Sequence, residues 1–60
     1  MSQVYNPETE TIAEIERLEL EVRDLRRRLN HARTEADKRV LNRQLNELRE
    51  QIEFLKSRVP

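Results

Sequence analysis

The sequence predicts an all-α fold: an antiparallel helical hairpin whose two long amphipathic helices associate into a four-helix bundle or coiled coil. Apolar residues recur at alternating steps of three and four, the heptad spacing of a helix that buries one narrow stripe. The 60 residues include no glycine and are 40% charged, a composition typical of long helices and coiled coils. A break in the heptad register near the middle of the chain then favours two helices over one.

The heptad stripe, called the seam below, consists of two runs. The first contains Ile15, Leu18, Val22, Leu25 and Leu29, and the second contains Leu41, Leu45, Leu48, Ile52 and Leu55. Ala32 and Ala36 extend the first run weakly, and five residues then separate Ala36 from Leu41. One straight helix would carry the two stripes on faces about 130° apart, too far for a single partner helix. We therefore expect an αα-hairpin, with a single continuous coiled-coil helix as the alternative.

The expected elements are a flexible N-terminal tail over 1–6, a helix over about 7–30, a bend over about 31–34 and a helix over about 35–58. Asn6 followed by Pro7 is a good helix start, because asparagine caps free amides and proline loses no hydrogen bond there. Thr11 to Glu14 forms a capping-box pattern and is an alternative start. Thr34 is placed to cap the second helix.

Self-association is expected from the size of the chain. A hydrophobic core of 60 residues is marginal without staples, and the chain has no cysteine for disulfides. We therefore expect a homodimer or higher oligomer held by the seam. Three apolar residues lie off the seam and would either widen this oligomer interface or form a candidate docking patch for another partner: Leu20, Val40 and Phe54.

Charge is strongly segregated although the net charge is zero. Glu8 to Glu21 contains six acids and one arginine, whereas Arg23 to Arg43 contains eight basic residues and three acids. The basic residues are Arg23, Arg26, Arg27, Arg28, Arg33, Lys38, Arg39 and Arg43. In a hairpin they surround the bend. They would either pair with the acidic end of another protomer or bind nucleic-acid phosphates.

The predicted function is that of a small homo-oligomeric helical interaction or adaptor protein that acts by protein–protein recognition. The alternatives are RNA or DNA binding through the basic bend of a hairpin dimer, and a coiled-coil scaffold or spacer in a larger assembly. We expect no enzymatic activity, because no nucleophile and base stand at a motif-like spacing. No cofactor, metal site, small-molecule substrate or membrane contact is expected, and the expected location is cytoplasmic.

Overall fold

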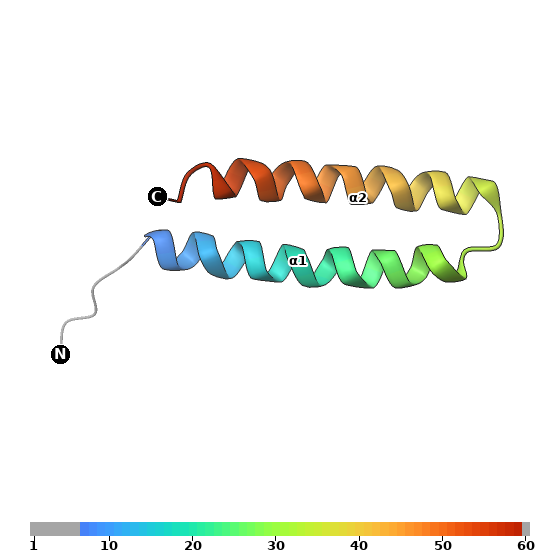
Figure 1. Cartoon of the computed structure of the whole chain (residues 1–60), viewed down its shortest axis with the longest axis horizontal. Coiled ribbons are helices and arrows are strands. Elements are labelled where there is room, and N and C mark those ends of the chain that lie inside the picture. Colours follow the sequence, from blue (N-terminus) through green and yellow to red (C-terminus); the bar gives the residue numbers. More distant parts are fainter. Residues whose placement is uncertain (1–6, 60) are drawn as a thin grey trace.

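The chain forms a two-helix antiparallel hairpin in the computed structural model, which describes residues 7–59. Helix α1 spans Pro7–His31 and helix α2 spans Glu35–Lys56, and the two lie side by side along their length (Figure 1). The predicted hairpin is confirmed, and the alternative of a single continuous helix is wrong. The tail predicted over 1–6, including the cap at Asn6, lies outside the described residues.

The bend is formed by residues 32–34 and is closed by a helix cap rather than by glycine. Thr34 has extended backbone angles, φ −115° and ψ 153°, and its Oγ1 accepts a hydrogen bond from the backbone N–H of Asp37 at 3.1 Å. Glu35 and Asp37 lie in the first turn of α2, where the helix dipole favours negative charge. No residue from 7 to 59 has a positive φ, so this bend does not require glycine.

The helix ends differ slightly from the expected ones. Helix α1 continues to His31, and the N–H of Ala32 donates to the carbonyl of Leu29 at 3.2 Å. Helix α2 ends at Lys56, two residues earlier than expected, with Ser57 as its C-cap. The Ser57 hydroxyl donates to the carbonyl of Phe54 at 2.6 Å, which satisfies a carbonyl that the helix leaves unpaired.

The core is small and lies along the line where the two helices meet. Four apolar side chains within the described range are buried, namely Ile15, Leu18, Leu45 and Ile52. Ile15, Leu18 and Ile52 form one cluster, against which pack Val22, Leu48, Leu55 and Val59. None of the described side chains has less than 2% of its surface exposed. Two helices alone therefore cover the seam incompletely.

Neither helix combines the length and the apolar character needed to cross a bilayer, within residues 7–59.

Candidate interaction surfaces

Two grooves flank the seam, one on each side of the hairpin, and both helices contribute to each. The glutamine groove has a volume of about 360 Å³ and is lined by Glu21, Asp24, Leu25, Arg28, Gln44, Glu47, Leu48 and Gln51. The arginine groove has a volume of about 290 Å³ and is lined by Glu19, Val22, Arg23, Arg26, Arg49 and Ile52. They share no residue, so the seam presents two chemically separate surfaces.

The heptad pattern explains why the two grooves differ. Successive helical residues are rotated by about 100°, so the two apolar positions of a heptad lean toward opposite sides of the seam. Leu25 and Leu48 occupy one of these positions and line the glutamine groove. Val22 and Ile52 occupy the other and line the arginine groove. The polar neighbours on each side then set the charge of each groove.

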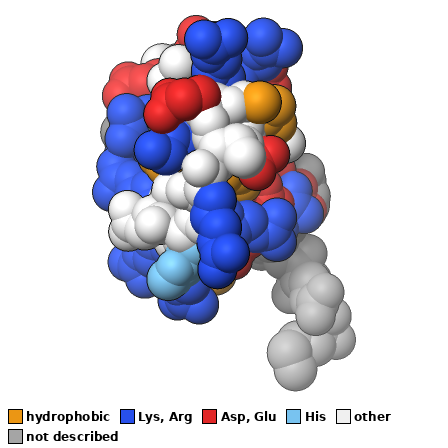
Figure 2. Space-filling view, turned by 90° about the vertical axis from the view of Figure 1, so that its right-hand side faces the viewer, with side chains coloured by type: hydrophobic (Ala, Val, Ile, Leu, Met, Phe, Trp, Pro, Cys, Tyr) orange, Lys and Arg blue, Asp and Glu red, His pale blue; other side chains and the backbone are white. Residues whose placement is uncertain are grey.

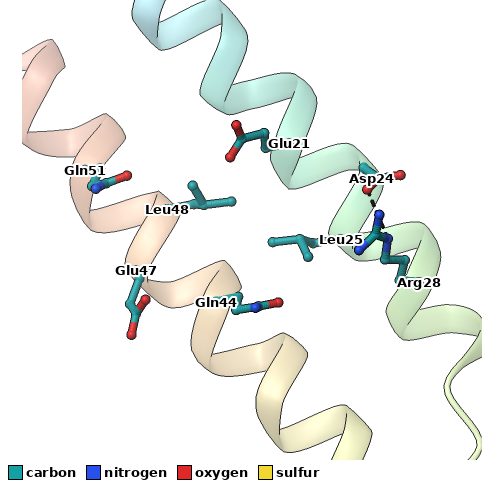
Figure 3. Close-up of a pocket in the computed structure, with 8 residues that line it drawn as sticks. All are labelled: Glu21, Asp24, Leu25, Arg28, Gln44, Glu47, Leu48 and Gln51. Atoms are coloured by element: carbon teal, nitrogen blue, oxygen red, sulfur yellow. Dashed lines mark ion pairs between the residues drawn. The ribbon is translucent and has the colours of Figure 1, made fainter.

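The glutamine groove has an apolar floor and a mildly acidic rim. Leu25 and Leu48 are half-buried and point toward each other from the facing helices (Figure 3). Gln44 and Gln51 add uncharged amides on the α2 side. The rim carries three carboxylates and one guanidinium, and Arg28 Nε lies 3.1 Å from Asp24 Oδ2. Half-buried leucine beside uncharged amides is suited to contact with another protein.

The arginine groove carries the opposite charge. Arg23 and Arg26 from α1 and Arg49 from α2 surround it, with Glu19 as its one carboxylate. Glu19 Oε2 lies 4.0 Å from Lys56 Nζ, an ion pair that links the two helices. Three guanidinium groups around one hollow are suited to an anionic ligand, because each can form two parallel hydrogen bonds to a phosphate or carboxylate.

The ten predicted seam residues lie between the two helices of the same chain. Ile15, Leu18, Leu45 and Ile52 are the buried members. The other six are half-buried: Val22, Leu25, Leu29, Leu41, Leu48 and Leu55. The seam therefore first holds the hairpin together. What it leaves exposed is available for a contact between protomers.

The predicted basic residues gather at the bend end of the hairpin but do not share one surface. Figure 2 looks onto this end, where basic side chains predominate. Arg26 lies in the arginine groove, whereas Arg28 lies in the glutamine groove. Lys38 is half-buried, and its Nζ lies 3.5 Å from Glu35 Oε1. The remaining basic residues that the sequence predicted are exposed, namely Arg23, Arg27, Arg33, Arg39 and Arg43.

Sequence reasoning missed Arg49, which lies outside the basic stretch but completes the arginine groove. The available signal was the antiparallel pairing itself, which brings Arg49 of α2 beside Arg23 and Arg26 of α1.

The predicted docking residues are exposed, with 60% of Leu20, 55% of Val40 and 60% of Phe54 accessible. They do not form one patch. Leu20 belongs to α1 and borders a hollow shared with Glu16, Glu19 and Arg23, beside the arginine groove. Val40 and Phe54 belong to α2 and are separated by two heptads, about 21 Å along the helix.

Phe54 has a cationic neighbour on its own helix, since the guanidinium carbon of Arg58 lies 5.5 Å from the ring centroid. Ile12, 44% exposed, is a further apolar surface residue that sequence reasoning did not single out.

Within residues 7–59, the structure brings together no group of three His, Asp or Glu side chains that could hold a metal ion. No protein-family model matches the chain, and no curated protein or solved structure matches it either.

Proposed function

We propose that this chain is a small homo-oligomeric helical interaction protein. A second copy covers the glutamine groove, which completes a four-helix bundle and leaves the outer surfaces to recognise another protein. In this arrangement the seam holds each hairpin, and the groove beside it holds the pair.

The observation that supports this proposal is the incomplete burial of the seam. Only four of its ten predicted residues are buried, and Leu25 and Leu48 line an open groove instead. Two packed helices of this length rarely bury enough apolar surface to be stable alone. A second hairpin would remove the exposed leucine from water at about 25 cal/mol per Å² of apolar surface.

Sedimentation equilibrium together with far-ultraviolet circular dichroism tests the proposal. We expect a mass of two protomers at micromolar concentration. We also expect a loss of helix signal on dilution, because dissociation uncovers the glutamine groove and leaves a hairpin with only a small core. A monomer that keeps its full helix signal across the same dilution range would contradict the proposal.

The arginine groove supports a second candidate function, RNA or DNA binding. Three guanidinium groups from two helices converge there with one carboxylate. Binding would weaken steeply as salt rises, because counterions are released from the phosphates. The groove lies on the opposite side of the seam from the glutamine groove, so a dimer formed through the latter would leave it open.

Fluorescence anisotropy with single-stranded and duplex oligonucleotides tests this candidate. We expect binding to be lost when Arg23, Arg26 and Arg49 are all changed to glutamine. The control changes Arg27, Arg39 and Arg43 to glutamine, which removes the same charge from exposed positions outside the groove. Equal losses in both variants, or no binding by the unchanged protein at 50 mM salt, would reject a nucleic-acid site in the arginine groove.

A further inference from the structure

We infer that the two copies pair antiparallel, with their bends at opposite ends, so that Val40 packs against Phe54 of the partner subunit. This inference rests on the proposed self-association and specifies its geometry. The two-fold axis crosses the hairpin near Glu47, perpendicular to the helices, so α2 lies against the partner's α2 and α1 against the partner's α1.

The spacing of residues on α2 supports this axis. Val40 precedes Glu47 by one heptad and Phe54 follows it by one, so all three share a heptad position on the side of the glutamine groove, which Glu47 lines. Gln44 lies three residues before Glu47 and Gln51 four residues after it, so uncharged amides flank this point on both sides. A two-fold axis at Glu47 brings Val40 of each copy onto Phe54 of the other.

The chemistry of the grooves indicates which side of the hairpin is covered. The glutamine groove offers half-buried leucine and two uncharged amides. Covering either groove with its own copy brings like charges together, because the arginine groove carries a net +2 and the glutamine groove a net −2. Like charges brought together at an interface are costly when water is excluded. The net charges are equal in size, so the apolar surface decides: the glutamine side offers two half-buried leucines and lies beside the exposed Val40 and Phe54, whereas Ile52 in the arginine groove is already buried.

Charge along the hairpin indicates the direction. The stretch from Glu8 to Glu21 carries a net charge of −5 and lies beside the stretch from Glu47 to Arg58, which is neutral. The bend end, from Arg23 to Arg43, carries +5. Hairpins stacked with both bends at one end would place +5 on +5. The antiparallel arrangement places each basic bend over the partner's acidic end, so opposite charges attract at both ends.

Engineered cysteines test the geometry, since the chain has no cysteine of its own. Val40→Cys and Phe54→Cys proteins are prepared separately, mixed and oxidised, and the products are identified by mass. We expect a disulfide between the two proteins, because the antiparallel dimer brings these positions together. The Val40→Cys protein alone should not cross-link, because its two copies would lie about 21 Å apart along the helix.

The matched control mixes Val40→Cys with Glu53→Cys. Glu53 is exposed, and its side chain is rotated by about 100° from that of its neighbour Phe54, so this pair should not form the bond. Circular dichroism and sedimentation of the reduced proteins check that each variant still folds and associates. Spin labels at the same two positions in associating variants give an independent distance.

The outcomes separate the two proposals. A bond between positions 40 and 54, absent from both controls, supports the antiparallel dimer. If the unchanged protein and its variants are dimers that lack this bond and whose labels are more than about 20 Å apart, the geometry is wrong and self-association stands. If the unchanged protein is a monomer by sedimentation, both proposals fail.

Discussion

The glutamine groove and the arginine groove lie on the two sides of one seam, yet they are suited to different partners. The first exposes leucine beside amides, with three carboxylates and one guanidinium on its rim. The second is floored by Val22 and Ile52 and carries three guanidinium groups and one carboxylate. The apolar floors are similar, so the difference comes from the polar residues next to the seam. In this hairpin the seam determines the fold, and its neighbours determine what each side can bind.

The largest expected effect comes from placing a polar side chain in the floor of the glutamine groove. Leu48→Asn removes half-buried apolar surface and leaves an amide without a partner, which should cost about 2–4 kcal/mol of stability. We expect the variant to lose the dimer and much of its helix signal. Urea titrations followed by circular dichroism measure the loss of stability. Glu50→Asn introduces the same side chain on an exposed surface and should change stability by less than about 0.5 kcal/mol.

A second pair of variants separates the two sides of the seam without disturbing the core. Phe54 and Leu20 are equally exposed, at 60% each, but only Phe54 is placed on the glutamine side. We expect Phe54→Ser to weaken dimerisation about tenfold, which corresponds to about 1.4 kcal/mol. Leu20→Ser should leave the dimer dissociation constant unchanged in sedimentation equilibrium. Equal losses in both variants would show that the glutamine side is not the preferred interface.

A substitution at the bend should destabilise the whole hairpin and therefore affect both grooves equally. It provides a reference for the substitutions that affect one groove only. Thr34→Ala removes the hydroxyl that accepts from the N–H of Asp37 at 3.1 Å. We expect a loss of about 1 kcal/mol from the cap, seen as a lower urea midpoint with the same slope. Thr34→Ser keeps the hydroxyl and should retain most of the stability. A selective loss of dimerisation without loss of hairpin stability would be inconsistent with this role.

The sequence was sufficient to predict the hairpin, because the register break after Ala36 left the two seam runs on different faces of any straight helix. It also predicted the cap at Thr34, where a hydroxyl precedes two acids in the first turn of α2. The cap is a local signal, whereas the register break follows from the heptad spacing along both seam runs.

The grooves were not predictable in the same way, because each combines residues from both helices. Arg26 and Arg28 are two residues apart in the sequence, and the helical rotation places them in different grooves. Arg49 lies outside the basic stretch and reaches the arginine groove only through the antiparallel pairing. Side-chain direction together with the partner helix therefore decides which charges act together.

The smallest expected effect is an increase in dimer affinity. It is the most specific test of the inferred dimer, because most substitutions would weaken association. Glu47 lies at the inferred two-fold axis, where it would face Glu47 of the partner subunit. Glu47→Gln should tighten the dimer a few-fold at low salt by removing this repulsion, and the gain should shrink above about 0.1 M salt as screening increases. Glu53→Gln removes the same charge away from the axis and should show no such gain. If Glu47→Gln weakens the dimer, the axis does not pass there, because a carboxylate that helps association must meet a cation.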